Sequence, residues 1–362
     1  MEHSHEFQNI FNQTPETQAY AHGRVNLLGE HTDYNDGYVL PIAIPQKTTV
    51  QLGFSLDEQH HIYSQELNEK ITIFRNNQPS GFASYIFGCI ELLQQAGYQI
   101  PSLNLYIKSS IPIGSGLSSS AALEVATLRG IRQLLNLPIN DVEIAQFAQQ
   151  AEINYAGVQC GIMDQMASSL ADTQHMLFLD TRTLARQILS FPALAEILII
   201  HSGCDRTLAG SKYNQRRSEC QQAAHLLGVK ALRDIDDVAT VEILPEPLHR
   251  RARHVVTENH RVLDAVEIIE DLQDNSASRF GELMNASHAS LRNDYEVSVP
   301  ALDTLVDILQ NASGVFGAKL TGAGFGGACV ALVASGAGKN IAATVLDEYS
   351  HAGYKGKVLV PE

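Results

Sequence analysis

Cysteine is scarce in this sequence, and its placement excludes the sites that cysteine pairs build. The 362 residues include five cysteines, an odd number, and no two of them form a Cys-x-x-Cys pair. This pattern argues against a disulfide framework and against a zinc site, which need paired or closely spaced cysteines. It is typical of a chain kept in a reducing compartment, and we therefore expect a cytoplasmic protein.

Long apolar runs are missing as well. No stretch of 18 apolar residues occurs, so we expect no membrane span. The first residues, MEHSHEFQNIFNQ, lack a basic region followed by an apolar one, so we expect no secretory signal.

Positive charge is in deficit. Lysine and arginine together number 25 against 40 aspartates and glutamates, which gives a formal net charge of -15. A field of that sign disfavours binding to nucleic acid and to anionic membranes. It also opposes a phosphate ligand, so a nucleotide site would need local help from backbone amides, a cation or a few arginines and lysines.

The length and the order of the expected elements favour two lobes. Periodicity predicts strands near 103–109, 176–181 and 196–203, helices over 121–137 and 142–157, a mainly helical stretch from about 208, and late strands near 317–320, 328–334 and 356–360. Because this order is mixed, we expect an α+β fold with mixed sheets flanked by helices. We place the boundary between an N-terminal lobe, 1–185, and a C-terminal lobe, 186–362.

The segment GRVNLLGEHTDYNDG (23–37) begins like a strand and then crowds ionisable groups together. Glu30, His31 and Asp33 supply acceptors and a mixed donor and acceptor within one short loop. Such a set suits the hydroxyls of a polyol better than a metal, because neighbouring residues rarely converge on one ion. A solvated turn is the simpler interpretation, and we accept it for Asp36, which precedes a glycine.

The segment IPIGSGLSSSAALEVA (111–126) joins a glycine turn to a predicted helix. Gly114 and Gly116 allow a ligand to approach the backbone, and a helix N-terminus attracts phosphate. A serine hydroxyl there can also bind Mg²⁺. No lysine follows as in the Walker pattern. Taken alone, such a segment is more often a flexible turn with a serine N-cap.

A second glycine-rich segment, KLTGAGFGGACVALV (319–333), lies between two predicted strands. Its glycines, Gly322, Gly324, Gly326 and Gly327, indicate either a close backbone approach or a tight hairpin turn. Taken alone, the two interpretations are about equally favoured.

Together, in this order and spacing, GRVNLLGEHTDYNDG, PIGSGLSSSAALEVA and LTGAGFGG resemble the three motifs of the GHMP small-molecule kinases, and the first is similar to the signature of galactokinases. The resemblance covers nearly the whole chain, including 151–172, 208–220 and 287–303. It implies a GHMP kinase fold with the active site between the lobes. It also implies MgATP-dependent phosphorylation of galactose at the anomeric C1 hydroxyl, which yields galactose 1-phosphate and ADP in galactose metabolism.

The resemblance further implies roles for individual residues. The sugar contacts fall on Arg24, Glu30, His31, Asp33, Gly161, Asp164 and Tyr213. The phosphate loop of the ATP site comprises Gly114, Ser115, Gly116, Leu117, Ser118, Ser119 and Ser120. The Mg²⁺ ligands fall on Ser120 and Glu152, and the catalytic pair on Asp164 and Arg24.

Asp164 lies in an otherwise apolar run, where a carboxylate is more often a helix cap or a satisfied buried acid. The resemblance favours a functional role, and a nearby Arg24 would favour the ionised carboxylate. Phosphoryl transfer depends mainly on positioning and charge neutralisation, which these residue types can supply.

Two positions depart from the pattern of the galactokinases. His22 stands where proline is common, and proline would stiffen the approach to Arg24. Phe82 stands where a tryptophan commonly lies beside adenine, and the chain contains no tryptophan. The sequence therefore does not identify the residues that contact adenine.

Two alternatives remain open on the sequence. A kinase for a related sugar, L-arabinose or galacturonate, would share these loops, and some relatives are non-catalytic galactose or ATP sensors. The intact serine loop together with Glu152 and Asp164 favours an active enzyme. We expect a monomer whose partners are its small-molecule substrates, galactose and MgATP, and neither nucleic acid nor membrane.

Overall fold

The computed structural model describes residues 4–74, 78–192, 194–204, 209–271 and 273–361. These residues form two compact units that interleave along the chain. The first unit comprises Met1–Arg24, Ile44–Pro112 and Ser118–Leu170, and the second comprises Val25–Ala43, Ile113–Leu117 and Ala171–Glu362. The lobe boundary expected at residue 185 stays a prediction.

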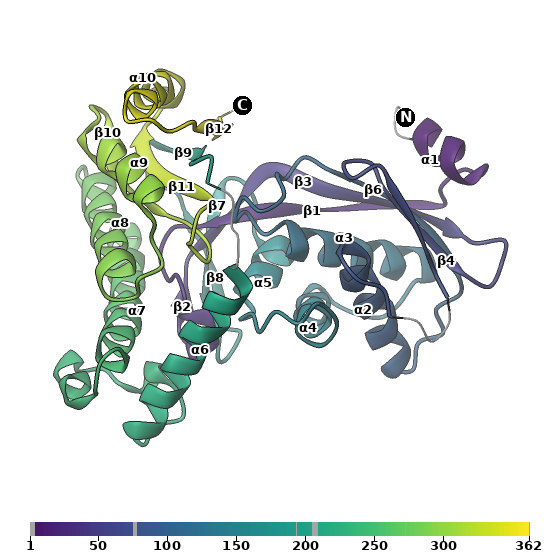
Figure 1. Cartoon of the computed structure of the whole chain (residues 1–362), viewed down its shortest axis with the longest axis horizontal. Helices are drawn as coiled ribbons and strands as arrows, with labels where there is room; N and C mark the ends of the chain where they lie inside the picture. The colour runs from purple at the N-terminus through teal and green to yellow at the C-terminus, as the bar shows by residue number, and fades with distance from the viewer. Residues whose placement is uncertain (1–3, 75–77, 193, 205–208, 272, 362) are drawn as a thin grey trace. The chain divides into compact units, whose positions relative to one another are not determined.

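The first unit is built on one mixed sheet (Figure 1). Its strands, in spatial order, are β1 (Thr17–Asn26), β3 (Pro41–Phe54), β6 (Leu103–Ser109), β4 (His60–Ser64) and β5 (Glu69–Ile73). The strand β6 pairs antiparallel with β3 and parallel with β4, which makes the sheet mixed. The strand expected over 103–109 is confirmed as β6.

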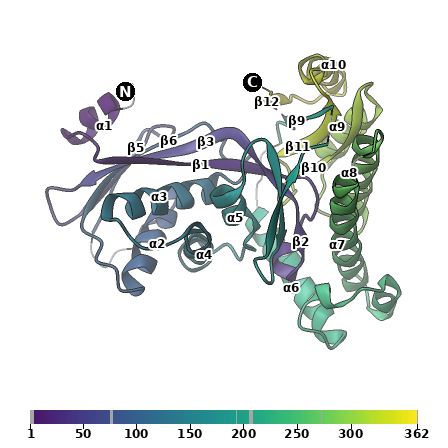
Figure 2. The same cartoon turned by 180° about the vertical axis from the view of Figure 1, so that it is seen from behind.

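Helices cover one face of this sheet, as both views show (Figures 1 and 2). They are α2 (Phe82–Gln95), α3 (Ser119–Leu135), α4 (Asp141–Ala151) and α5 (Met163–Leu170), while α1 (Ser4–Phe11) lies near the N-terminus. The helix α3 packs so closely on β3 that a Cβ on Gly130 would lie 2.3 Å from the Leu52 side chain. A larger residue at position 130 would therefore require the end of the Leu52 side chain to move.

The helix expected over 142–157 is confirmed, although only its first part is α-helical. The α-helical segment α4 begins after a capping box formed by Asn140 and Glu143 and ends at Ala151. The next turn, η2 (Glu152–Ala156), is a π-helix. Such turns often occur at functional sites, and this one begins with Glu152.

The second unit contains two antiparallel sheets. The larger has the order β10 (Val315–Leu320), β11 (Ala328–Ala334), β9 (Ala195–His201) and β12 (Lys357–Val360). The smaller has the order β2 (Tyr38–Val39), β7 (His175–Asp180) and β8 (Arg186–Ser190). The strands expected in the second half of the chain are thereby confirmed, and the segment 321–327 is the connection of the β10–β11 hairpin.

The helices of the second unit confirm the helical pattern expected from about residue 208. They are α6 (Ala209–Leu226), α7 (Leu248–Glu270), α8 (Ser276–Asn293), α9 (Pro300–Asn311) and α10 (Gly338–His351), with short turns η1 (Asp33–Asn35), η3 (Leu232–Asp234) and η4 (Val238–Ile243). The long helices α7 and α8 lie side by side (Figure 2). A Cβ on Gly281 of α8 would lie 2.1 Å from the carbonyl oxygen of Phe316, so helix and strand meet at their backbones.

The α+β composition with mixed sheets flanked by helices is therefore confirmed. All five cysteines are free thiols, as the absence of close cysteine pairs predicted. Over the described residues, none of the helices combines the length and the apolar character that crossing a bilayer requires.

Candidate active site

The first unit brings Arg24 and Asp164 together. Asp164 lies in the first turn of α5, and Arg24 lies near the end of β1. The Nε of Arg24 donates to Oδ1 of Asp164 at 2.7 Å, and the hydroxyl of Ser118 donates to Oδ2 at 2.6 Å. Both carboxylate oxygens of Asp164 thus accept hydrogen bonds. The arginine side chain is 4% exposed and the aspartate 29%, so the carboxylate remains open to a ligand.

Ser120 and Glu152, the two expected metal ligands, also lie in contact. The Ser120 hydroxyl donates to Oε1 of Glu152 at 3.2 Å, and Gln165 donates to Oε2 at 2.7 Å. Burial, together with the negative charge of Asp164, raises the pKa of Glu152 to about 7. The pattern of residue types did not indicate Gln165, which orients this carboxylate.

A third carboxyl group lies beneath this pair. Glu124 of α3 is fully buried, and within the described residues no salt bridge pairs its carboxyl group with a lysine or arginine. Burial and then the charge of Glu152 raise the pKa of Glu124 well above its usual value. Burial thus favours the protonated form of both Glu124 and Glu152, so the cluster holds carboxyl groups next to Ser120 that would ionise fully only beside a cation.

The glycine-serine loop adopts the left-handed backbone conformation that glycine favours. Gly114, Gly116 and Ser118 all have positive φ, at 74°, 83° and 61°. Ser118 occupies the N-cap position of α3, but its side chain makes no capping hydrogen bond and contacts Asp164 instead. The serine cap considered for this turn is thus absent at Ser118, whose hydroxyl links the loop to the carboxylate.

In the second unit, Glu30 joins the first motif to the glycine-rich third motif. Its Oε1 accepts from the backbone N–H of Gly322 at 2.7 Å and from Nζ of Lys319 at 3.2 Å. Lys319 is fully buried and also donates to the carbonyl of Asn26. Lys319 was missed by sequence reasoning, although a lysine inside the apolar strand β10 is a signal that could have found it.

His31 lies next to Glu30 and is equally buried. Its Nδ1 is 2.8 Å from the hydroxyl of Tyr34, and its Nε2 is 3.2 Å from the carbonyl oxygen of Ala323. The ring of Tyr213, on α6, lies 5.5 Å from the imidazole between ring centroids. The structure therefore places two of the expected sugar contacts, His31 and Tyr213, side by side.

Two buried residues of α7 support this loop and were not expected. Glu258 accepts from the backbone N–H of Gly29 at 2.9 Å, and His254 contacts the carbonyl of Glu30 at 3.0 Å. Burial opposes ionisation of Glu258, but the charge of Arg261 outweighs it and the pKa falls to about 2. Burial lowers the pKa of His254 to about 4, so this imidazole is neutral near pH 7.

The remaining expected residues fall in both units. Asp33 begins η1 in the second unit, and its Oδ1 accepts from the N–H of Tyr34. Gly161 is buried in the connection before α5 of the first unit. Arg24, Gly161 and Asp164 thus belong to the first unit, and Glu30, His31, Asp33 and Tyr213 belong to the second.

Asp36 and His22 have structural partners. Asp36 has a positive φ of 58° and pairs with Arg182 at 3.1 Å, in agreement with its interpretation as a turn residue. His22 stands where a proline was expected, and its Nδ1 is 2.8 Å from the carbonyl of Ile44 on β3. The side chain of His22 therefore ties β1 to its neighbouring strand just before Arg24.

The oxygen ligands around Ser120 fit magnesium better than a softer metal. Over the described part of the chain, no three histidine, cysteine, aspartate or glutamate side chains form a group that could hold an ion. A serine hydroxyl beside one carboxylate is the sparse, oxygen-only set that Mg²⁺ uses when phosphates complete its coordination.

Comparison with known proteins agrees with the motifs. The description "GHMP kinases N terminal domain" matches residues 84–172, "Galactokinase galactose-binding signature" matches 5–54, and "GHMP kinases C terminal" matches 268–351. A galactokinase of Roseiflexus sp. (strain RS-1) is 42% identical over 340 residues, which cover 90% of this chain and 86% of that protein.

Solved structures agree with the sequences. Lactococcus lactis galactokinase complexed with galactose superposes with a TM-score of 0.91 at 35% identity, over 98% of this chain and 96% of that one. Methanococcus jannaschii mevalonate kinase shares the fold, with a TM-score of 0.68 at 20% identity over 94% and 97% of the two chains. The expected GHMP kinase fold is thus confirmed, and since sequence and backbone agree over almost the whole length, the chain belongs to the galactokinase family of the GHMP kinases.

Proposed function

We propose that this protein transfers the γ-phosphoryl group of ATP to the anomeric C1 hydroxyl of galactose. The oxygen of that hydroxyl bonds to the γ-phosphorus, the bond from this phosphorus to the β–γ bridging oxygen breaks, and the products are galactose 1-phosphate and ADP. The observation that carries the proposal is the position of Asp164, which is hydrogen-bonded both to Arg24 and to Ser118 of the phosphate loop. The chain's likeness to two galactokinases supports the choice of sugar.

Asp164 orients the C1 hydroxyl and accepts its proton. Its two oxygens are held by separate donors, so the carboxylate keeps one orientation without a substrate. Such preorganisation matters because positioning supplies much of the catalysis in phosphoryl transfer. Arg24 places a nearly buried positive charge beside the reacting atoms, where negative charge builds up on the phosphoryl oxygens.

The sugar is recognised by the remaining expected contacts, Glu30, His31, Asp33, Gly161 and Tyr213. The two carboxylate oxygens of Glu30 have different partners. Oε1 is taken by Gly322 and Lys319, and Oε2 is the atom that accepts from a sugar hydroxyl. A buried, fixed acceptor of this kind selects one epimer, because the wrong epimer leaves it unpaired.

The nucleotide phosphates bind along the loop Gly114–Ser120, and Ser120 and Glu152 hold Mg²⁺. When bound there, the ion neutralises charge on the phosphate oxygens and fixes their geometry. Glu152 must lose its proton to bind the ion, and its raised pKa means that the ion has to displace that proton near neutral pH. We further propose a cytoplasmic monomer whose only substrates are small molecules.

Substrate choice is tested by ADP release across a panel of galactose, glucose, L-arabinose, galactosamine and galacturonate, each with MgATP. We expect the highest kcat/KM with galactose. A preference for arabinose or galacturonate would assign the chain to a related sugar kinase. Tight sugar binding without ADP release from any sugar would identify a sensor and contradict the proposal.

The role of Asp164 is tested with Asp164→Asn. The amide cannot accept the hydroxyl proton, so kcat should fall by about 10²- to 10⁴-fold, the range typical of a lost general base. Galactose binding, measured by calorimetry, should persist. Asp264→Asn, at an exposed position of α7, is the control, and near-normal turnover of Asp164→Asn would exclude proton transfer to this residue.

Arg24→Ala removes the cation that contacts Asp164. We expect kcat to fall by about 10²- to 10³-fold, as for the loss of one transition-state donor. The Kd for galactose should change only moderately. Arg279→Ala, at an exposed position of α8, controls for loss of charge, and a variant that loses sugar affinity but keeps kcat would limit Arg24 to substrate binding.

Glu152→Gln tests the raised pKa through stability in metal-free buffer. Between pH 4.5 and about 7 the folded state keeps a proton that the unfolded state has lost, so wild-type stability falls as pH rises. Glutamine cannot ionise, so above pH 7 the variant should be more stable by up to about 3 kcal/mol, at about 1.4 kcal/mol per pKa unit.

Denaturant unfolding at several pH values measures this difference, which should shrink toward pH 4.5. Glu58→Gln, at an exposed loop position, should show no such pH dependence. MgATP should stabilise the wild type more than Glu152→Gln. A difference between the two proteins that does not vary with pH would contradict the assignment.

A further inference from the structure

A buried chain of hydrogen bonds ends on His31. The thiol of Cys220 on α6 lies 3.1 Å from the hydroxyl of Tyr295, which lies 2.7 Å from the hydroxyl of Tyr34. The Tyr34 hydroxyl in turn lies 2.8 Å from Nδ1 of His31. All of these residues belong to the second unit, and no motif assigned a role to Tyr34, Tyr295 or Cys220.

The donor-to-acceptor direction of these hydrogen bonds follows from the contact that His31 makes with Ala323. The Nε2 of His31 lies 3.2 Å from the carbonyl oxygen of Ala323, and a carbonyl can only accept, so Nε2 carries a hydrogen. The imidazole is 3% exposed and lies against the rings of Tyr213 and Tyr295. A neutral ring with its hydrogen on Nε2 has a lone pair on Nδ1, so Tyr34 must donate to it.

The hydrogen bonds between Tyr34, Tyr295 and Cys220 run in the same donor-to-acceptor direction, toward His31. Once Tyr34 donates to His31, its oxygen accepts from Tyr295, whose oxygen accepts from the thiol. Burial raises the pKa of the Cys220 thiol to about 11 and raises the pKa of Tyr34 and of Tyr295 well above the usual value. All three groups therefore keep their hydrogens near pH 7, and each can donate to the next.

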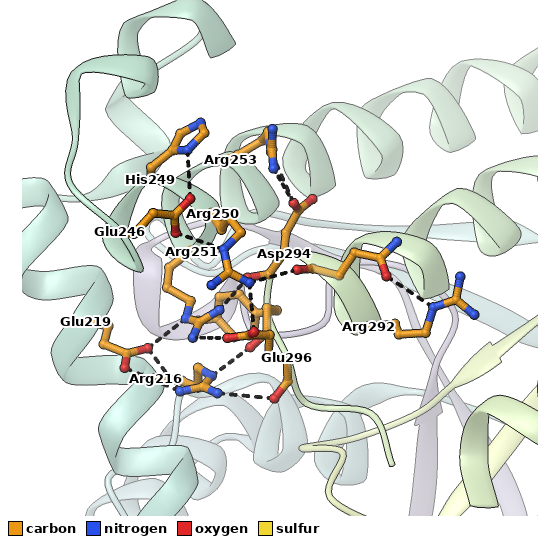
Figure 3. Close-up of polar contacts among 12 residues, drawn as sticks. Arg216, Glu219, Glu246, His249, Arg250, Arg251, Arg253, Arg292, Asp294 and Glu296 are labelled. Carbon is orange, nitrogen blue, oxygen red and sulfur yellow. Dashed lines mark hydrogen bonds and ion pairs between the residues drawn. The ribbon is translucent and has the colours of Figure 1, made fainter. Parts of the chain in front are cut away.

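Figure 3 shows an arginine clamp, which Arg216 and Arg251 form around Glu219. The clamp holds the backbone at Asp294 and Tyr295. Arg216 donates through Nε to the carbonyl of Tyr295 at 2.7 Å, and Arg251 donates to the carbonyl of Asp294. Both guanidinium groups are almost fully buried, and both bind Oε2 of Glu219, at 3.1 and 2.8 Å. Because the clamp's charges are satisfied internally, it acts as a support rather than as an open anion site.

Glu296, the residue after Tyr295, is held by arginines as well. Glu296 has a positive φ of 55°, which a glutamate rarely adopts, and its carboxylate pairs with Arg250 at 2.7 Å and Arg251 at 2.6 Å. These two arginines lower the pKa of Glu296 to about 2. Val297 then accepts from the N–H of Phe325 at 2.7 Å, so the clamped segment also fixes the glycine-rich third motif.

We propose that Tyr34 and Tyr295 are positioning residues that fix His31 as a hydrogen-bond donor to the sugar. The bond from the Nε2–H of His31 to Ala323 is at the upper end of the usual range of lengths, so a sugar oxygen can share or replace that acceptor. This inference rests on the proposed function, in which His31 contacts galactose. Because Nε2–H can then only donate, His31 recognises the oxygen of one sugar hydroxyl as an acceptor and does not use that hydroxyl's hydrogen.

The tautomer is tested first, by ¹⁵N NMR of the histidine rings of the wild-type protein at pH 7. The signals of His31 are assigned by their loss in His31→Gln. We expect a protonated Nε2 and an unprotonated Nδ1. A ring protonated on Nδ1, alone or on both nitrogens, overturns the proposal, and this reading does not depend on which sugar the enzyme uses.

The positioning role is tested with Tyr34→Phe, and with Tyr295→Phe in case one variant fails to fold. His31 should then show a mixture of tautomers, and the KM for galactose should rise about tenfold, as expected for one buried hydrogen bond. The KM for ATP should stay within about twofold of the wild-type value, since ATP does not depend on His31. Equal loss for both substrates indicates only structural damage and overturns the positioning role.

Tyr63→Phe is the control, because it also removes a hydrogen-bonded tyrosine hydroxyl, here one that donates to Asn68 in the first unit. It should leave both KM values unchanged. The donor role is tested with pairs of galactose analogues in which one hydroxyl is replaced by fluorine or by hydrogen. Fluorine can accept but not donate, so at one ring position the fluoro-sugar should bind better than the deoxy-sugar.

That preference should disappear in Tyr34→Phe. Equal binding of the two analogues at every position of the wild-type site overturns the donor role. If the wild type does not phosphorylate galactose at all, the proposed function fails, while the NMR result still decides the tautomer.

Discussion

Pairing of buried carboxylates with buried cations is the constraint on which the rest of this structure depends. A chain with a net charge of -15 has few cations to place, and an unpaired charge inside a protein costs several kcal/mol. Yet Glu30 lies against Lys319, Glu258 against Arg261, Asp164 against Arg24, and Glu219 against two arginines. Three of these contacts, Glu30–Lys319, Asp164–Arg24 and Glu219–Arg251, join segments that are far apart in sequence, so satisfying these charges helps to fix where the segments lie within each unit. The other two, Glu258–Arg261 and Glu219–Arg216, lie within one helix.

Glu124 and Glu152 are the exceptions to this pattern. Among the described residues, no salt bridge joins either carboxyl group to a lysine or arginine, and burial raises both pKa values. The protein thus leaves a deficit of basic partners, with the protonated carboxyl forms favoured, in the cluster where a cation is proposed to bind. A site completed by Mg²⁺ needs such a deficit, because a resident arginine or lysine would compete with the ion.

The sequence allowed the chemistry-bearing segments to be predicted better than their supports. The strand β6 and the helix α3 agree with what periodicity indicated, and the contact of Arg24 with Asp164 agrees with the roles that the family resemblance implied. Gln165, Glu258 and Tyr295 were missed, since a single polar residue on a helix or in a loop looks the same whether it faces water or a buried partner. Those partners are set by tertiary packing, which periodicity does not encode.

Local sequence patterns also failed to predict two details at residues of the proposed site. Ser118 occupies an N-cap position, for which serine is favoured, but its hydroxyl binds Asp164 and leaves the cap unmade. Likewise, the helical spacing over 142–157 continues past the point where α4 becomes a π-turn at Glu152. In both places the local rule is broken at a residue that the proposed chemistry uses, which is where such departures are expected.

The glycine-rich third motif shows why two interpretations of one segment can both hold. It is the connection of the β10–β11 hairpin, so the turn interpretation is right. It is also a place of close backbone approach, because a Cβ on Gly324 would lie 2.3 Å from the carbonyl oxygen of Val297. That contact brings the loop against the segment held by the arginine clamp, while Gly322 donates to Glu30 and Ala323 lies against His31. The glycines therefore serve recognition indirectly, by letting one backbone loop fix the two side chains proposed to bind the sugar.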